Sequence, residues 1–331
     1  MKPRVLSGMR PTGALHLGHY HGALKNWVRL QDEHECFYFV ADWHALTTHY
    51  ADHADLEHNV YDMVVDWLAA GIDPDRATLF IQSRLPEHAE LFTLLAMGTP
   101  LSWLERVPTY KDQMKALTGR DLATYGFLGY PLLQAADILI YQAAFVPVGE
   151  DQAPHVEITR EVARRFNHLY GEGQTVLPEP ATLLTETSKL PGLDGAKMSK
   201  SLGNDIAMRE EPAEVERKIR RMPTDPDRVR RTDTGNPERC PVWQFHKLYS
   251  DADTRAWVVK GCTTAGIGCL ECKQPVIDAI KKEQEPWRER AETYLSNPKH
   301  VHWIVEVGTE RARTVAGKTM REVRGAMGLN Y

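Results

Sequence analysis

The stretch "RVLSGMRPTGALHLGHYHGALKNWV", residues 4–28, decides the fold. Its first residues read as a short buried strand, and the glycines and proline of residues 8–13 form a turn. From Leu17 onward, apolar residues recur at helical spacing. A buried strand that runs through a glycine–proline turn into an amphipathic helix is typical of the opening unit of an alternating α/β protein.

The same alternation continues over the first two thirds of the chain, whereas the residues from about 211 onward show only helical patterns. Alternating strands and helices predict an α/β fold, a Rossmann-like, doubly wound, mainly parallel sheet, followed by an all-helical C-terminal domain. Residues 171–196, rich in Gly, Pro, Leu and Thr, read as a loop-like connection. Strands are expected at 4–8, 36–42, 77–83 and 145–148, and the two domains at 1–205, with a helical insertion around 85–125, and at 206–331.

The composition limits the class of protein. The 331 residues are 42% hydrophobic and 26% charged, with a formal net charge of −5, as in ordinary globular proteins. A chain with this net charge is not a general polyanion binder, so any contact with nucleic acid needs local basic patches. No apolar run reaches the length of a membrane span and no secretory signal is visible, so we expect a cytoplasmic protein without membrane contact. Five cysteines argue against a disulfide framework.

His16 and His19 flank Gly18 at the start of the first helix. Such histidines are often surface or capping residues, and two positions three apart share a helix face on which a metal could bind. No third ligand is evident nearby, and neither the G-x-G-x-x-G nor the Walker pattern is present. The first turn of a helix attracts phosphate through its free N–H groups, so these imidazoles can serve as additional donors to an anion.

A second cluster occurs in "GAKMSKSLGN", residues 195–204, which carries Lys197 and Lys200 between glycines. Alone it could be a solvated basic loop. Together with the two histidines, it forms a set suited to a triphosphate whose charge is stabilised in the transition state. We expect the loop to close over that ligand.

The predicted helix from Tyr130 is apolar on most faces but carries one polar stripe, formed by Tyr130, Gln134, Asp137 and Tyr141. A polar stripe on a buried helix must find partners, either in a core network or in a bound ligand. An ionised Asp137 only accepts hydrogen bonds and an indole N–H only donates, so the two match. A phenol is also a donor, which leaves a tyrosine pocket as the alternative.

The order "HLGH" (16–19) and "KMSKS" (197–201) resembles the two signature motifs of class I aminoacyl-tRNA synthetases. Together with "VADWHALTT", "YPLLQAADIL" and "VPVGEDQ", the whole chain resembles bacterial tryptophanyl-tRNA synthetases. The resemblance implies that L-tryptophan and ATP, with Mg²⁺, form an adenylate and pyrophosphate, and that tryptophan then passes to tRNA(Trp). It also implies a homodimer. The alternatives are a tyrosyl-type synthetase, a small-molecule nucleotidylyltransferase, or a paralogue with a binding or regulatory role.

The resemblance also implies roles for individual residues, which fall into three groups. The catalytic residues would be His16, His19, Lys197 and Lys200. ATP would contact Arg10, Pro11, Thr12, Gly18, His19, Gly149, Glu150, Asp151, Lys197, Met198, Ser199, Lys200 and Ser201. Tryptophan would contact Gly8, His44, Tyr130, Gln134, Asp137, Val146, Val148 and Gln152.

Four cysteines, Cys240, Cys262, Cys269 and Cys272, lie within a short stretch with the spacing C-x21-C-x6-C-x2-C. Four thiolates suit either Zn²⁺ or a [4Fe–4S] cluster, and spacing alone does not decide between them. A similar pattern occurs in a subset of bacterial tryptophanyl-tRNA synthetases that hold a [4Fe–4S] cluster, which favours iron–sulfur here. The nearby basic run at 217–231 is predicted to be an anticodon-binding surface.

Overall fold

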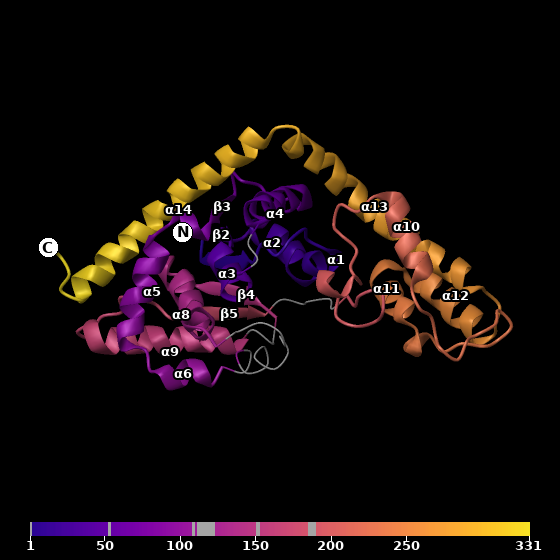
Figure 1. Cartoon of the computed structure of the whole chain (residues 1–331), viewed down its shortest axis with the longest axis horizontal. Coiled ribbons are helices and arrows are strands. Elements are labelled where there is room, and N and C mark those ends of the chain that lie inside the picture. Colours follow the sequence, from indigo (N-terminus) through magenta and orange to yellow (C-terminus); the bar gives the residue numbers. More distant parts are fainter. Residues whose placement is uncertain (1, 52–53, 108–109, 111–122, 150–152, 185–189) are drawn as a thin grey trace.

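A parallel β-sheet forms the centre of the computed structural model, which describes residues 2–51, 54–107, 110, 123–149, 153–184 and 190–331 (Figure 1). In the described part of the chain, the sheet has five strands in the order β3-β2-β1-β4-β5. This topology confirms the predicted doubly wound fold. The strands are β1 (Arg4–Met9), β2 (Glu35–Val40), β3 (Ala77–Ile81), β4 (Phe145–Val148) and β5 (Ala181–Leu184).

The helices between the strands follow the predicted alternation. The first one is interrupted, because residues of the "HLGH" segment form a single α-turn that passes into a π-helical turn before regular helix resumes. The bounds are α1 (Leu17–His19), η1 (Tyr20–Leu24), α2 (Lys25–Leu30), α3 (Asp42–His49), α4 (Leu56–Ala70), η2 (Gln82–Arg84), α5 (Glu87–Gly98), α6 (Leu101–Glu105), α8 (Tyr125–Ile140) and α9 (Ala153–Tyr170).

Two predicted details were wrong. Residues 171–196 are not only a connection, because they contain β5, which pairs in parallel with β4 from Phe145↔Ala181 to Val148↔Leu184. Four residues after a proline-rich turn are too few to show strand periodicity, so only the pairing reveals this strand. The apolar helix predicted from Tyr130 is α8, which begins earlier, at Tyr125, carries Pro131 in its interior and ends at Ile140.

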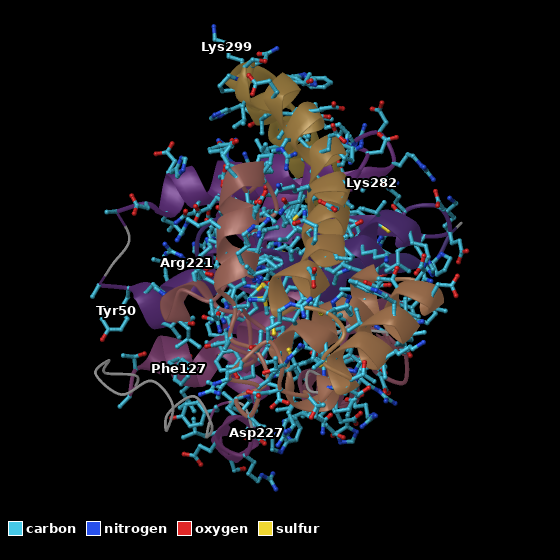
Figure 2. The ribbon with its side chains drawn as sticks, turned by 90° about the vertical axis from the view of Figure 1, so that its right-hand side faces the viewer. Tyr50, Phe127, Arg221, Asp227, Lys282 and Lys299 are labelled. Carbon is cyan, nitrogen blue, oxygen red and sulfur yellow. The ribbon has the colours of Figure 1, made fainter. Side chains whose placement is uncertain are left out.

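The helical C-terminal part confirms the change of character seen in the sequence. It comprises η4 (Lys200–Leu202), α10 (Pro212–Arg221), η5 (Pro237–Arg239), α11 (Pro241–Tyr249), α12 (Ala252–Thr263), α13 (Cys269–Leu295) and α14 (Pro298–Ala326). The long helices α13 and α14 meet at an angle, and α14 runs back beside β3 (Figure 1). Figure 2 looks onto α13, with Lys282 on it and Arg221 at the end of α10. Within the described residues, no helix combines the length and apolar character needed to cross a membrane.

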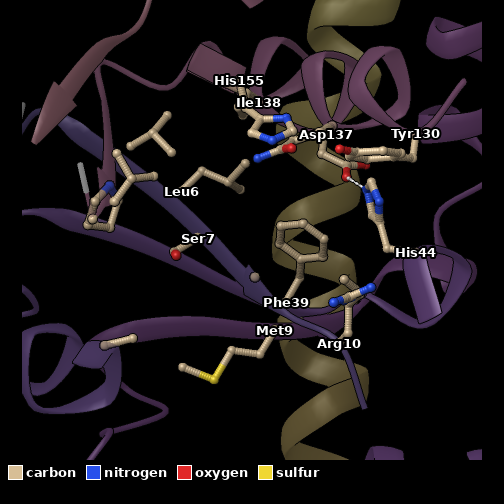
Figure 3. Close-up of a pocket in the computed structure, with 18 of the residues that line it drawn as sticks. Leu6, Ser7, Met9, Arg10, Phe39, His44, Tyr130, Asp137, Ile138 and His155 are labelled. Carbon is tan, nitrogen blue, oxygen red and sulfur yellow. Dashed lines mark hydrogen bonds and ion pairs between the residues drawn. The ribbon is translucent and has the colours of Figure 1, made fainter. Parts of the chain in front are cut away.

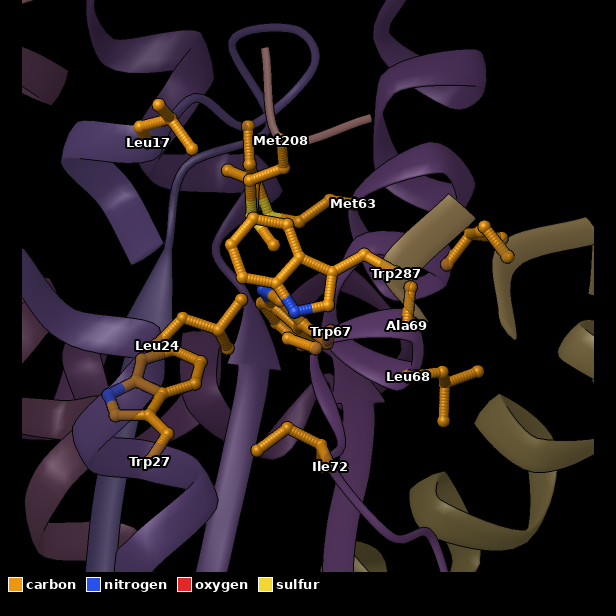
Figure 4. Close-up of a cluster of buried hydrophobic side chains, with 14 of the residues drawn as sticks. Leu17, Leu24, Trp27, Met63, Trp67, Leu68, Ala69, Ile72, Met208 and Trp287 are labelled. Carbon is orange, nitrogen blue, oxygen red and sulfur yellow. The ribbon is translucent and has the colours of Figure 1, made fainter. Parts of the chain in front are cut away.

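One hydrophobic core joins the two parts of the chain. Trp27 stacks on Tyr38 with ring centres 4.4 Å apart and meets Trp67 edge-on at 5.3 Å. Trp287 of α13 and Met208 belong to the same buried cluster (Figure 4). Large aromatic side chains dominate the energetics of such cores. The C-terminal helices are therefore packed against the sheet domain through shared apolar surface.

Candidate functional site

A cavity of about 360 Å³ opens at the carboxyl ends of β1, β2 and β4 (Figure 3). In doubly wound sheets, ligands bind at this edge, where the strand order changes direction. Its polar walls come from Arg10 after β1, from His44 on α3, and from the polar side chains of α8. Of the residues predicted to contact tryptophan, those that line the cavity are Gly8, His44, Tyr130, Gln134, Asp137, Val146 and Val148.

Asp137, which is 1% exposed, lies at the wall of this cavity and is surrounded by donors. His44 Nε2 lies 2.7 Å from Asp137 Oδ2, and His88 Nδ1 lies 2.6 Å from Oδ1. Gln82 Nε2 donates to Oδ1 at 2.8 Å and, at 3.0 Å, to Oδ2. The carboxylate is therefore held from two sides by hydrogen-bond donors.

These donors determine the charge of Asp137. Burial by itself raises the pKa of the carboxyl group, but the hydrogen bonds and the electrostatic attraction of His44 and His88 together outweigh burial, so the pKa of Asp137 lies below its ordinary value. The group is ionised at neutral pH and can only accept hydrogen bonds. A buried, ionised acceptor in a cavity selects ligands that carry a matching donor.

Gln82 and His88 were not among the predicted site residues. Gln82 follows β3 directly, and His88 lies in the first turn of α5 after "SRLPE". A polar side chain directly after a buried strand is the signal that could have indicated Gln82. His88 carried no such signal, because one histidine at a helix start is usually a surface residue.

His16 and His19 lie at the start of α1 with their rings stacked 3.7 Å apart. The backbone N–H of His16 donates to His19 Nδ1 at 3.2 Å, which leaves the His19 Nε2 position to carry the ring proton. Burial, with the charge of nearby Lys200, lowers the pKa of His16 to about 4, and burial lowers that of His19 to about 3. Both imidazoles are therefore neutral near pH 7 and offer N–H donors rather than positive charges.

The structure brings "KMSKS" against the "HLGH" turn. Lys200 lies beside Gly13, where an added Cβ would collide with Lys200 Nζ, and Met198 Cβ lies 3.5 Å from the Cβ position of Gly18. Leu17 N donates to Ile206 O at 2.9 Å, and Met208 N donates to Leu15 O at 2.8 Å. The two motifs, some 180 residues apart in sequence, form one continuous surface.

Asn204 organises the lysine loop from within. It is buried, and its Oδ1 accepts from Ser199 N at 2.7 Å. Its Nδ2 donates to Lys197 O at 3.1 Å and to Asp194 Oδ1 at 2.8 Å. One side chain thus fixes the backbone on both sides of Met198.

A buried ion pair holds the segment that follows this loop. Asp66 of α4, 1% exposed, accepts from Leu15 N at 3.0 Å and from Arg209 Nε at 2.6 Å. Burial raises the pKa of Asp66 to about 6, although the charge of Arg209 opposes this shift. Since Leu15 precedes His16 directly, Asp66 ties the "HLGH" turn to the residues after "KMSKS".

The remaining predicted nucleotide residues lie in or near the same surface. Arg10 and Gly149 line the cavity. Pro11 is buried, and Thr12 N donates to Arg10 O at 2.8 Å. Ser201 belongs to the backbone of η4. Glu150, Asp151 and Gln152 lie outside the described residues, so their predicted contacts stay predictions.

The four cysteines of the C-terminal part, Cys240, Cys262, Cys269 and Cys272, line one small cavity together with Arg228 and Lys273. Burial, and then the other three thiols, raise the pKa of Cys272 to about 12. Arg228 Nη1 lies 3.9 Å from Cys262 Sγ, and His246 Nε2 lies 3.4 Å from Cys272 Sγ. Among the described residues, no group of three or more His, Cys, Asp or Glu side chains is arranged to hold a metal ion.

The basic run at 217–231 is largely neutralised. Arg217 pairs with Glu214, Lys218 Nζ lies 2.5 Å from Glu210 Oε2, and Arg220 Nε lies 2.9 Å from Glu216 Oε1. Arg228 is buried beside the cysteines. The exposed cations that remain without a described ion pair include Arg221 and Arg230.

Comparison with known proteins places this geometry in a family. Residues 1–283 match the family model of class I tRNA synthetases (W and Y). The chain is 59% identical to a tryptophan–tRNA ligase of Ralstonia nicotianae, with 99% of both chains covered. It is 54% identical to that of Thermotoga maritima, covering 99% of this chain and 100% of the other. The structure of tryptophanyl-tRNA synthetase from Campylobacter jejuni complexed with ADP and tryptophan matches with a TM-score of 0.87 at 33% identity, covering 98% of this chain and 100% of that one.

Proposed function

The chain belongs to the family of class I tRNA synthetases for tryptophan and tyrosine, and we propose that the Asp137 cavity is the site at which it selects tryptophan. Its function is that of a tryptophan–tRNA ligase, an aminoacyl-tRNA synthetase of the bacterial type. The observation that carries the site proposal is the ionised, buried carboxylate of Asp137 in the wall of a cavity.

Hydrogen-bond capacity supports this assignment. A carboxylate offers about four lone-pair positions. His88 and Gln82 occupy Oδ1, whereas Oδ2 has one short bond, from His44, and a longer contact that Gln82 shares with Oδ1. An indole N–H entering the cavity would therefore take the place of the longer Gln82 contact on Oδ2. A ligand without this donor would forgo a hydrogen bond to a charged acceptor, and such a bond contributes about 1.5–3 kcal/mol.

The surface formed by "HLGH" and "KMSKS" is proposed to hold ATP, together with Mg²⁺. A tryptophan carboxylate oxygen attacks the α-phosphorus, a new P–O bond forms, and the bond to the leaving pyrophosphate breaks. His16 and His19 would donate neutral N–H groups to the phosphates, while Lys197 and Lys200 would offset the charge that develops on pyrophosphate. Such a displacement depends on positioning and charge, so no protein nucleophile is assigned. A hydroxyl of the terminal adenosine of tRNA(Trp) then attacks the acyl carbon, and AMP leaves.

The lysine loop would supply the positioning in this step. Asn204 fixes its backbone, and the Asp66–Arg209 pair fixes the strand-like contact between residues 206–208 and the "HLGH" turn. We propose domains at 1–205 and 206–331, with the chemistry in the first, residues 206–209 packed against its "HLGH" turn, and the tRNA-binding helices in the second. On the second domain, Arg221 and Arg230 are the exposed cations that we propose for phosphate contact. A homodimer is expected from the family and can be tested by light scattering.

We propose that the four-cysteine cavity holds a [4Fe–4S] cluster, with Zn²⁺ as the alternative. The support is that all four cysteines line one small cavity beside two cationic side chains. Cys240, Cys262, Cys269 and Cys272 would hold the cluster, and Arg228 and Lys273 would offset its negative charge. The cluster would cross-link the segments around α11, α12 and α13 rather than take part in catalysis.

Metal analysis tests this proposal. Anaerobically purified protein should contain about four iron and four sulfide per chain. Cys272→Ser should lower both, and Cys36→Ser, which changes a buried cysteine of β2, should leave them unchanged. Stoichiometric zinc without sulfide would replace the cluster proposal by a zinc site.

Pyrophosphate exchange into ATP tests the proposed selection directly. We expect exchange with L-tryptophan in the absence of tRNA, and at least a hundredfold lower kcat/KM with L-tyrosine or L-phenylalanine. Exchange that prefers tyrosine would overturn the assignment of the cavity. Absence of exchange with every amino acid would favour a binding or regulatory role.

A further inference from the structure

A buried polar chain lies behind the proposed tryptophan site. Tyr141 at the end of α8 reaches His88 of α5, with 2.7 Å between the Tyr141 hydroxyl and His88 Nε2. His88 Nδ1 in turn lies 2.6 Å from Asp137 Oδ1. Both His88 and Tyr141 are 0% exposed, and His88 is absent from the cavity lining. A ligand in the cavity would therefore touch Asp137 but not His88.

The proton positions in this chain follow from its chemistry. An ionised carboxylate only accepts, so His88 Nδ1 carries a proton and donates it to Asp137. Burial, and then the charge of Asp137, raise the pKa of Tyr141 well above its ordinary value, so its hydroxyl keeps its proton. In the tautomer with the proton on Nδ1, Nε2 accepts from the Tyr141 hydroxyl. Each polar atom of His88 has a defined partner and a defined role.

The surroundings of His88 are otherwise apolar. Its ring centre lies 6.1 Å from that of Phe39, 6.1 Å from that of Phe80 and 5.4 Å from that of Tyr141. In such a site a histidine must give up water, and only the two hydrogen bonds compensate for this. The two hydrogen bonds at opposite ring nitrogens direct the His88 donor towards Oδ1.

We propose that His88 is a positioning residue for tryptophan selection, which holds the Asp137 carboxylate so that Oδ2 faces the cavity and can accept the indole N–H. This inference rests on the proposed function, in which Asp137 receives that N–H. His88 sets the orientation from the side opposite to the ligand, and Tyr141 sets the tautomer of His88. Selection against ligands without a donor then depends on residues that no ligand contacts.

The test compares two amino acids that differ in this one donor. L-tryptophan and 3-(3-benzothienyl)-L-alanine have similar shapes, but sulfur replaces the indole N–H in the second. The ratio of their kcat/KM values in pyrophosphate exchange measures how much the N–H contributes. His88→Gln moves the side-chain donor away from the Nδ1 position, whereas His88→Asn keeps a donor close to it. Tyr141→Phe removes only the hydroxyl that fixes the tautomer.

We expect the wild-type ratio to fall about tenfold in His88→Gln, because tryptophan loses activity and the benzothienyl analogue does not. His88→Asn should keep the ratio within about threefold of wild type, and Tyr141→Phe should lower it about threefold. A purely structural role would lower both kcat/KM values equally in every variant, and an unchanged ratio in His88→Gln and Tyr141→Phe would overturn the proposal. If His88→Gln does not fold, Tyr141→Phe decides.

Failure of the underlying function would look different. If the wild-type protein uses the two amino acids equally well, or if Asp137→Asn leaves the ratio unchanged, Asp137 does not read the indole N–H. If Asp137→Asn abolishes the preference while the ratio survives in His88→Gln and Tyr141→Phe, only the role of His88 is wrong.

Discussion

Gly308 of α14 packs directly on the backbone of β3, and its replacement by alanine should loosen that contact. A Cβ at this position would lie 2.7 Å from the carbonyl carbon of Leu79 and 3.0 Å from its nitrogen, and closer still to its oxygen. All three atoms belong to the main chain of a hydrogen-bonded strand. No rotation of a side chain can make room, so the helix must move away from the sheet.

The size of the effect follows from these distances. Carbon atoms pack best at about 3.5–4.0 Å, so α14 must retreat by roughly 1 Å at this point. Overpacking of this kind costs about 1–3 kcal/mol, whereas alanine in place of glycine in a helix returns about 0.5–1 kcal/mol. We expect a net loss of about 1–2 kcal/mol in the free energy of unfolding.

Gly317 offers a matched control on the same helix. The nearest atom to a Cβ there is Arg321 Nη1 at 3.8 Å, so Gly317→Ala meets no obstacle and should stabilise the helix by about 0.5–1 kcal/mol. Urea unfolding followed by circular dichroism should therefore show a lower midpoint for Gly308→Ala than for wild type and a higher one for Gly317→Ala. Because Gln82 lies three residues after Leu79, the KM for tryptophan should rise only in Gly308→Ala. Equal or reversed midpoints would refute the reasoning.

Three further predictions concern the nucleotide surface. Gly13 has φ +114°, and an added Cβ there would collide with Lys200. Gly13→Ala should therefore raise the KM for ATP about tenfold and leave the KM for tryptophan within threefold of wild type. Equal changes in the two KM values would contradict this prediction. Asn204→Ala should likewise raise the KM for ATP in pyrophosphate exchange, because the lysine loop loses its internal hydrogen bonds, and unchanged kinetics would contradict it. Since the pKa values of His16 and His19 are about 4 and about 3 in the folded protein but near 6.5 when unfolded, the unfolded chain binds more protons between these values. The free energy of unfolding should therefore fall as the pH drops from about 7 to 4. Over the same pH range, the urea midpoint of His19→Gln should fall less than that of the wild-type protein. An equal decrease in both proteins would contradict a buried, neutral His19.

The sequence predicted the fold well where periodicity is long. The largely apolar segments predicted as strands at 36–42 and 77–83 correspond to β2 and β3, and the residues from 211 onward are helical as predicted. β5 was not predicted, because four residues are too few to establish an alternating pattern. It is recognised as a strand only from its pairing with β4. The π-helical turn at Tyr20–Leu24 was not predicted either. The spacing of apolar residues does not distinguish a π-helical turn, which contains one extra residue, from an α-helical turn.

For the site, sequence motifs located the ligand-facing residues but not those behind them. His44 and Asp137 lie on segments with a recognisable pattern, and the structure places both at the cavity. Gln82 and His88 come from a different helix and turn, and only the folded chain brings them to Asp137. The Asp66–Arg209 pair likewise joins residues 143 positions apart. Such contacts depend on tertiary packing, which no local pattern records.

At the basic run, residues 217–231, the sequence indicated more surface charge than the folded protein has. Its composition indicated a nucleic-acid surface, but the helix α10 pairs several of its cations with acidic residues one turn away. Charge along a sequence therefore overstates the field at the surface of the folded protein.

The most direct test of the central claim is the dissociation constant of tryptophan for the wild-type protein and for Asp137→Asn, measured by isothermal titration at pH 7.5. A hydrogen bond to a charged group contributes about 1.5–3 kcal/mol, which corresponds to a roughly 10- to 150-fold weaker affinity when the charge is removed. We predict a loss within this range for tryptophan and a change of less than about threefold for the benzothienyl analogue. Equal affinity of the two proteins for tryptophan would contradict the assignment of Asp137 as the residue that recognises the indole nitrogen.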